Sequence, residues 1–197
     1  MDNGKFIIIE GIDGSGKSTQ CKLIADFLTK QGYEVTLTKE PTDFETGKFI
    51  RQVLRGEKGQ LPPLEFQKLY VKDREEHLEK IVEPALSKGK IVISDRYFFS
   101  TIAYGSIDLP VEDLEQLNSH FRIPDMTIML DIPIEESLNR INNVRNIEFF
   151  ENENKLAKVM KTYQTFQEKY PNIHILDGTK SLEKVTEDIK ALVTSIL

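Results

Sequence analysis

Gly11-Ile12-Asp13-Gly14-Ser15-Gly16-Lys17-Ser18 follows the apolar run Phe6-Ile7-Ile8-Ile9 after a single glutamate, Glu10. The run is short and rich in β-branched residues, so we expect a buried strand at Lys5–Glu10. The residues after the loop have a helical pattern, and we expect a helix over Lys17–Gln31 that ends at Gly32. A loop of the form Gly-x-x-x-x-Gly-Lys-Ser between a strand and a helix is typical of phosphate binding. The stretch therefore predicts a protein that binds a nucleoside triphosphate.

The chemistry of phosphate gives each part of this loop a role. Glycines let successive backbone N–H groups turn toward phosphate oxygens, where a Cβ would obstruct them. The helix that begins near Lys17 directs the positive end of its dipole at the anion. Lys17 can reach the β- and γ-phosphates, and the Ser18 hydroxyl suits Mg²⁺, which takes few protein ligands. We expect the nucleotide to contact a consecutive set of residues: Gly11, Ile12, Asp13, Gly14, Ser15, Gly16, Lys17, Ser18 and Thr19.

Strands and helices alternate along the rest of the chain. We expect strands at Lys5–Glu10, Tyr33–Thr38, Ile91–Ser94, Met126–Asp131 and Ile173–Leu176. We expect helices at Lys17–Gln31, Thr46–Arg55, Leu61–Lys88 (with Pro84 as a possible kink), Phe99–Tyr104, Val111–Phe121, Ile134–Ile141, Lys155–Lys169 and Leu182–Ile196. Such alternation predicts an α/β fold with a parallel sheet covered on both faces. The fold class is thus a three-layer αβα domain with a five-stranded parallel sheet, like that of P-loop nucleoside triphosphate hydrolases.

Length and composition fit one domain over residues 1–197. The chain has 197 residues, 39% of them hydrophobic, which suffices for one core. The polar segment from Asn142 to Asn154 interrupts the helical pattern, and we interpret it as a short mobile lid; an ordinary surface loop is the alternative.

Charge and cysteine content restrict the partners and the compartment. The net charge of −6 argues against nucleic acid and anionic membranes as partners, because both attract basic surfaces. No stretch reaches the roughly 20 apolar residues of a membrane span. The single cysteine, Cys21, allows no internal disulfide and is expected to be a packed thiol, which suits a cytoplasmic protein.

A second acidic position is expected beside the loop. The strand at Ile91–Ser94 is followed by Asp95 and Arg96, and ligands of parallel sheets bind at the carboxyl ends of the strands. We therefore expect Asp95 to bind Mg²⁺ together with Ser18. Asp131 ends another apolar strand in the same way but has no adjacent arginine, so it ranks second. A surface ion pair is the alternative reading of Asp95.

Two further patterns narrow the class of enzyme. A guanine-reading Asn-Lys-x-Asp motif is missing, because the nearest match, Asn154–Ala157, has no aspartate. Phosphoryl transfer between two nucleotides gathers many negative charges, so cations must come from several directions. The chain offers a set of spaced arginines that could supply them: Arg51, Arg74, Arg96, Arg140 and Arg145.

Taken in order, these motifs closely resemble the thymidylate kinase family of nucleoside monophosphate kinases over nearly the whole chain. The matching segments are Phe6–Thr19, Lys39-Glu40-Pro41, Ile50-Arg51, Tyr70-Val71-Lys72-Asp73-Arg74 and Asp95–Tyr104. The Glu40-Pro41-Thr42 form and the short lid look most like archaeal and related members. The resemblance implies transfer of the γ-phosphoryl group of ATP to dTMP, giving dTDP and ADP in dTTP biosynthesis. It also implies a homodimer formed through helices flanking Leu61–Lys88 and Asp95–Tyr104.

The same resemblance implies a role for each acceptor-site residue. Asp13 would accept a hydrogen bond from the sugar 3′-hydroxyl, and Glu40 would organise the phosphate and metal region. Arg51 and Arg96 would bind the 5′-phosphate. The remaining residues would act at the base and sugar: Tyr70 by stacking, Arg74 by donating to the 4-carbonyl, Thr101 by touching the base edge, and Tyr104 by packing on the sugar.

The family places a catalytic basic residue either in the phosphate loop or in the lid. The variable loop positions here are not basic, so the chain resembles the lid type, with Arg145 as the expected catalytic arginine and Arg140 a possible surface residue. Lys17, Arg96 and Asp95 complete the expected catalytic set.

The chain departs from many members at Tyr70, where they carry Phe, and at Gly105, where many bacterial members carry a Gln that touches the base. A kinase for another nucleotide therefore remains an alternative, as does a non-catalytic nucleotide-binding module.

Overall fold

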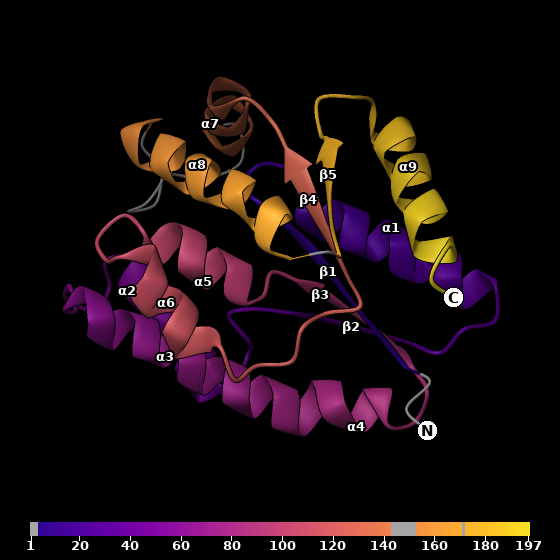
Figure 1. Ribbon diagram of the computed structural model, residues 1–197, viewed down its shortest axis with the longest axis horizontal. Helices are drawn as coiled ribbons and strands as arrows, with labels where there is room; N and C mark the ends of the chain where they lie inside the picture. Colours follow the sequence, from indigo (N-terminus) through magenta and orange to yellow (C-terminus); the bar gives the residue numbers. More distant parts are fainter. Residues whose placement is uncertain (1–3, 143–152, 171) are drawn as a thin grey trace.

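The computed structural model describes residues 4–142, 153–170 and 172–197, which form one sheet with helices on both of its faces (Figure 1). Its strands all run parallel, in the order β2-β3-β1-β4-β5. They are β1 (Lys5–Gly11), β2 (Val35–Lys39), β3 (Ile91–Asp95), β4 (Met126–Asp131) and β5 (Ile173–Asp177). The predicted five-stranded parallel sheet and three-layer αβα class are confirmed.

The helices form the two outer layers of the molecule. Their bounds are α1 (Lys17–Lys30), α2 (Glu45–Leu54), α3 (Pro63–His77), the π-helical turn η1 (Leu78–Val82), α4 (Glu83–Leu86), α5 (Phe98–Gly105), α6 (Val111–Asn118), α7 (Ile134–Asn142), α8 (Glu153–Lys169) and α9 (Leu182–Thr194). Helices α1 and α9 lie side by side against one face of the sheet, and the stretch from α3 to α4, α5 and α8 covers the other (Figure 1).

Strand β1 is the centre of the fold because its neighbours cover it completely. Phe6, Ile7, Ile8 and Ile9 are all fully buried. Side chains of a strand alternate between faces, so Ile7 and Ile9 pack with α1 and α9, whereas Phe6 and Ile8 pack with the helices of the other face. A continuous apolar run with both faces buried is what a parallel sheet requires of a central strand.

Register places the carboxyl ends of neighbouring strands together. Ile9 of β1 pairs with Asp95 of β3, and Gly11 pairs with Leu130 of β4. The loop that leaves β1 therefore lies beside Asp95 at the carboxyl edge of the sheet.

The long helical stretch predicted over Leu61–Lys88 is present but changes its winding. Helix α3 gives way to the π-helical turn η1, and α4 follows with Pro84 in its first turn. Proline lacks an N–H and its ring clashes with the carbonyl four residues earlier, here that of Lys80, so a wider turn at this point accommodates it.

Several other predicted boundaries are off by one to three residues: β2 begins at Val35, not at Tyr33, and α9 ends at Thr194, not at Ile196. Helix α6 ends at Asn118, not at Phe121, and α8 begins at Glu153, before Lys155. Asn142, Glu153 and Asn154 belong to helices, so they are not part of a loop; residues 143–152, the rest of the predicted lid, lie outside the described residues.

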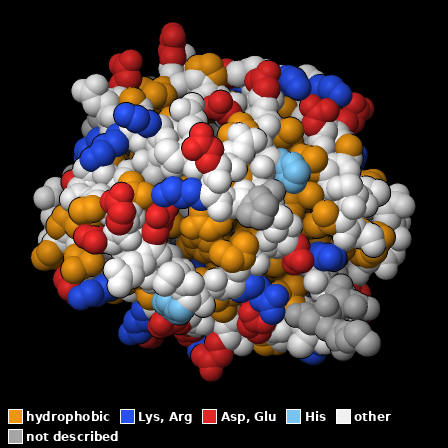
Figure 2. Space-filling view, viewed as in Figure 1, with side chains coloured by type: hydrophobic (Ala, Val, Ile, Leu, Met, Phe, Trp, Pro, Cys, Tyr) orange, Lys and Arg blue, Asp and Glu red, His pale blue; other side chains and the backbone are white. Residues whose placement is uncertain are grey.

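Two features of the structure concern the partners that the sequence argued against, nucleic acid and membranes. On the face in Figure 2, positive and negative side chains are interspersed around a group of hydrophobic side chains, so this face offers no purely basic surface to a polyanion. No helix in the described parts of the chain combines the length and apolar character that crossing a membrane requires.

Candidate active site

The glycine loop turns sharply between β1 and α1. Gly11 has φ 141° and Gly14 has φ 73°, conformations that L-residues rarely adopt. A Cβ on Gly11 would lie 2.6 Å from the carbonyl oxygen of Leu130, and one on Gly14 would lie 2.8 Å from that of Ser137. Glycine is therefore required at both positions. Because glycine has no Cβ, the backbone N–H groups of the loop stay accessible to a phosphate.

Lys17 and Ser18 begin α1 and face the loop and β3. Lys17 is 6% exposed, and its Nζ donates to the carbonyl oxygen of Ile12 at 2.7 Å. Burial and the nearby Arg96 lower the pKa of Lys17, while Asp13 and Asp95 act in the opposite direction. The Ser18 hydroxyl donates to the carboxylate of Asp95. Two oxygen ligands thus lie together beside a buried lysine, which fits a Mg²⁺ site that is completed by phosphate and water.

Asp131 lies elsewhere at the same edge. It sits at the end of β4 beside Asp177 of β5, and burial followed by repulsion from Asp177 raises its pKa. These two carboxylates line a cavity with Pro133 and Thr179. Of the two aspartates that the sequence offers as metal ligands, Asp95 is the one in contact with Ser18.

A cavity of about 260 Å³ opens next to the phosphate loop. Every residue that the sequence assigns to the acceptor lines it: Asp13, Glu40, Arg51, Tyr70, Arg74, Arg96, Thr101 and Tyr104. Five residues to which the sequence analysis gave no role line it too: Pro41, Leu54, Gln67, Tyr97 and Ser100. The lining comes from α2, α3, α5 and the loops after β1, β2 and β3, so the cavity is a product of tertiary structure.

Arg96 joins the cavity to the phosphate loop. Its backbone φ of 75° is unusual for a residue with a side chain. Its guanidinium donates to Asp13 Oδ1 at 2.7 Å and to the carbonyl oxygen of Gly11 at 3.2 Å. The Tyr104 hydroxyl donates to Asp13 Oδ2 at 3.2 Å. Burial, and then the negative charge of Asp13, raise the pKa of Tyr104, so this hydroxyl stays protonated.

Arg51 reaches the cavity from α2. Its Nη1 donates to the carbonyl oxygens of Pro41 and Thr42, both at 2.7 Å, and its Nη2 lies 3.0 Å from Asp43 Oδ1. Three of its five N–H groups are thereby used within the described residues. These bonds fix the side chain in place and leave donors for a ligand.

Arg74 is 1% exposed and is held on three sides. It donates to Glu40 Oε2 from Nε at 2.9 Å and from Nη2 at 2.8 Å. It also donates to Thr101 Oγ1 at 2.7 Å and to Asn118 Oδ1 at 2.6 Å. Within the described residues, four of its five N–H groups are used in these bonds and one Nη1 hydrogen is not.

Glu40 lines the acceptor cavity, and its described partners are Arg74 and His77. One carboxylate oxygen accepts from Arg74 and the other lies 2.9 Å from His77 Nδ1. Burial acts to raise the pKa of Glu40, but Arg74 and His77 outweigh it and hold this pKa below its ordinary value. Both carboxylate oxygens are therefore directed at Arg74 and His77, so Glu40 holds the Arg74 side chain in the wall of the acceptor cavity.

A buried hydrogen-bond network under the cavity was missed in the sequence. Glu10 is fully buried and accepts from the Tyr97 backbone N–H at 2.8 Å and from the Ser100 hydroxyl at 2.7 Å. Ser100 Oγ in turn accepts from Arg96 Nη1 at 2.7 Å, and Tyr163 OH donates to Glu10 at 3.0 Å. The sequence did contain one signal for this network: Glu10 directly follows an apolar strand. A carboxylate in such a place is buried only when other groups hydrogen-bond to it, so partners for Glu10 could have been expected.

Of the two arginines considered for the lid, Arg140 and Arg145, the structure describes only Arg140. Arg140 Nη1 donates to the carbonyl oxygen of Gly14 at 3.1 Å, and its Nη2 donates to that of Gly178 at 3.3 Å. Its side chain is 37% exposed and also pairs with Glu136 on the same helix, so Arg140 lies at the helix surface and in addition links the phosphate loop to the loop after β5. Arg145 lies outside the described residues.

Comparisons with known proteins agree with one another. A family model described as "Thymidylate kinase" matches residues 9–189. A protein of Pyrococcus horikoshii described as "Probable thymidylate kinase" is 45% identical over 196 residues, covering 96% of each chain. A "Thymidylate kinase" of Desulfotalea psychrophila is 39% identical, covering 98% of this chain and 96% of its own. The solved structure of thymidylate kinase from Candida albicans superposes with a TM-score of 0.84 at 26% identity, covering 98% of this chain and 92% of that one.

Proposed function

This chain belongs to the thymidylate kinase family, and from that premise we propose that it transfers the γ-phosphoryl group of ATP to dTMP, giving dTDP and ADP. The observation that carries the proposal is the cavity beside the phosphate loop, which every expected acceptor residue lines. Donor and acceptor sites that share Asp13 and Arg96 are what direct transfer between two nucleotides requires.

On the donor side, the loop backbone would hold the triphosphate and Lys17 would neutralise the β- and γ-phosphates. Ser18 and Asp95 would hold Mg²⁺, which when bound neutralises charge on the β- and γ-phosphate oxygens. The bond between Arg140 and Gly14 supports the loop from behind. Arg145 is proposed to complete the cationic ring around the transferred group.

On the acceptor side, the 5′-phosphate would bind Arg51 and Arg96, both of which keep donors free of bonds within the described residues. Asp13 would accept the sugar 3′-hydroxyl, and Tyr104 would pack on the sugar. The base would stack on Tyr70, with its edge toward Arg74 and Thr101. These positions would align acceptor oxygen and γ-phosphate, and alignment with charge neutralisation is most of what this reaction needs.

Two further properties are part of the proposal. The homodimer that the family resemblance implies is one of them. Sedimentation equilibrium that gave only the mass of one chain would remove it. A cytoplasmic location is supported by Cys21, whose buried thiol suits a reducing compartment.

The test is a coupled assay of ADP release with ATP, Mg²⁺ and a panel of dTMP, dUMP, dCMP, dGMP and thymidine. A strong preference for dTMP supports the proposal. Activity centred on another monophosphate would keep the chemistry and overturn the roles of Tyr70, Arg74 and Thr101. Nucleotide binding with no turnover on any acceptor would leave a non-catalytic binding module.

A further inference from the structure

Gln67 is a buried polar side chain in the wall of the acceptor cavity. It belongs to α3, where Tyr70 and Arg74 lie three and seven residues further on and so share its helix face. The side chain is 5% exposed, and it lines the same cavity as Tyr70 and Arg74. A glutamine is thus built into the part of the cavity proposed to hold the base.

The amide of Gln67 lacks a partner on its oxygen. Among the residues that the structure describes, Gln67 Oε1 is buried and accepts no hydrogen bond. Leaving a buried acceptor unpaired is unfavourable, so such groups in native proteins call for a partner that arrives later or for a special role. The neighbouring Arg74 has the same character, with one N–H left over after its bonds to Glu40, Thr101 and Asn118.

Gly105 makes room for this amide. A Cβ at Gly105 would lie 3.0 Å from the amide carbon of Gln67 and 2.8 Å from Leu114 Cδ2. Any side chain there would push Gln67 or Leu114 out of place. The position of the Gln67 side chain on α3 therefore depends on glycine at position 105, at the end of α5.

We propose that Gln67 is a specificity-determining residue that reads the edge of the acceptor base, an inference that rests on the proposed function. A thymine or uracil edge presents a carbonyl, the N3–H and a second carbonyl. Arginine can only donate, so Arg74 pairs with a carbonyl, and the N3–H requires an acceptor. Gln67 Oε1 is the unpaired acceptor on the same wall.

Cytosine is rejected by the same two groups. Its N3 carries no hydrogen, and its 4-amino group donates where Arg74 also donates. With cytosine bound, the Gln67 oxygen stays unpaired or the amide must turn over. Sites that hydrogen-bond one substrate discriminate well against an analogue that leaves their buried groups unpaired. Gln67 therefore separates imide bases from cytosine, and it does not separate thymine from uracil, which have the same edge.

The test uses Gln67→Met in the full chain, because methionine has a similar length and helix propensity but cannot hydrogen-bond in this way. Gln116→Met makes the same change at an exposed position of α6 and is the matched control. For each protein, kcat/KM is measured with ATP and dTMP, dUMP or dCMP, and the binding of each monophosphate is measured by calorimetry without ATP.

We expect Gln67→Met to lower kcat/KM for dTMP and dUMP equally, by about 10- to 100-fold, and to lower that for dCMP much less. The dTMP/dCMP ratio should narrow while the dTMP/dUMP ratio stays constant. The Tm should not fall, because the substitution removes a buried oxygen without a partner. Gln116→Met should change none of these values.

Each alternative outcome has one meaning. Unchanged selectivity in Gln67→Met, or an equal loss on all three acceptors, overturns the inference and leaves the proposed function standing. Wild-type protein that binds dTMP and dUMP over dCMP, loses that preference in Gln67→Met, and yet turns over no acceptor supports Gln67 and overturns the kinase. Wild-type protein that binds no pyrimidine monophosphate overturns both.

Discussion

Glu40→Ala should destabilise the protein far more than loss of an exposed carboxylate does. The Glu40 side chain is 4% exposed and lies 2.8 Å from Arg74 Nη2, whose side chain is 1% exposed. Removing Glu40 leaves the guanidinium buried without this partner, and breaking a buried ion pair in this way costs about 3–5 kcal/mol. For a chain of this size, that corresponds to a fall in Tm of roughly 6–20 °C.

Urea unfolding at pH 7 measures this cost directly, with Glu83→Ala as the control. Glu83 also pairs with an arginine, at 2.8 Å from Arg122, but its side chain is 44% exposed. Its loss should cost about 0–1 kcal/mol. Glu40→Gln keeps the size of the side chain and one acceptor for Arg74, so it should fall between the two. Equal losses in Glu40→Ala and Glu83→Ala would refute the reasoning.

The pH dependence of this contribution has a definite sign. The folded-state pKa of Glu40 is lowered from its ordinary value of 4.5, because Arg74 and His77 outweigh the effect of burial. The carboxylate therefore contributes its full stability above the unfolded-state pKa, and that contribution is lost as pH falls through the folded-state pKa. The difference in unfolding free energy between wild type and Glu40→Gln should be largest near neutral pH and should shrink below about pH 4.5. A difference that grows toward acid pH contradicts this.

Three further substitutions test separate parts of the site. Lys17→Ala should lower kcat by at least about 100-fold with an unchanged circular dichroism spectrum, because a buried cation next to the transferred group is lost; activity near that of wild type would remove the phosphate-loop assignment. Arg145→Ala should lower kcat, measured by single turnover, far more than it weakens dTMP binding, since its contact is proposed to form in the transition state; an unchanged kcat would exclude it. Tyr97→Phe should leave Tm unchanged or raise it, because the buried Tyr97 hydroxyl has no partner among the described residues; a Tm lowered by several degrees would reveal a bond to this hydroxyl.

The fold and the phosphate loop could be predicted because their signals are local. The run from Phe6 to Ile9 has the composition of a buried strand. The spacing of residues from Gly11 to Ser18 indicates a loop whose backbone N–H groups bind phosphate. Helix ends were less certain. Helix α6 stops at Asn118, whose side chain turns back to bond both its own helix and Arg74, a tertiary choice that no local pattern records.

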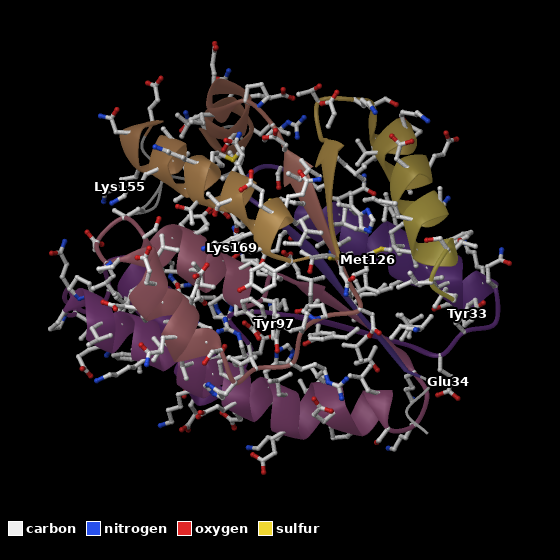
Figure 3. The ribbon with its side chains drawn as sticks, viewed as in Figure 1. Tyr33, Glu34, Tyr97, Met126, Lys155 and Lys169 are labelled. Atoms are coloured by element: carbon white, nitrogen blue, oxygen red, sulfur yellow. The ribbon has the colours of Figure 1, made fainter. Side chains whose placement is uncertain are left out.

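The acceptor cavity could be expected only through the family resemblance, and its supporting residues could not be expected at all. His77 and Ser100 act through partners 37 and 90 residues away in the chain, Glu40 and Glu10. Tyr97, inside the molecule between the sheet and its helices (Figure 3), lines the cavity and packs edge to face against Phe6 of β1. Nothing in a single sequence specifies such contacts, because their spacing depends on how the layers pack.

The three arginines of the cavity can be sorted by the exposure of their carboxylate partners. Within the described residues, Arg96 pairs with Asp13, whose side chain is 31% exposed, and Arg51 pairs with Asp43, which is 71% exposed. Arg74 pairs with Glu40, which is 4% exposed. Water reaches both of these carboxylates, Asp43 more than Asp13, so an incoming phosphate dianion can compete with them more easily than with Glu40. It cannot displace Glu40 without leaving a second buried charge unpaired. Arg51 and Arg96 are thus suited to bind phosphate, whereas Arg74 stays fixed and presents its remaining N–H to a neutral group such as a base carbonyl.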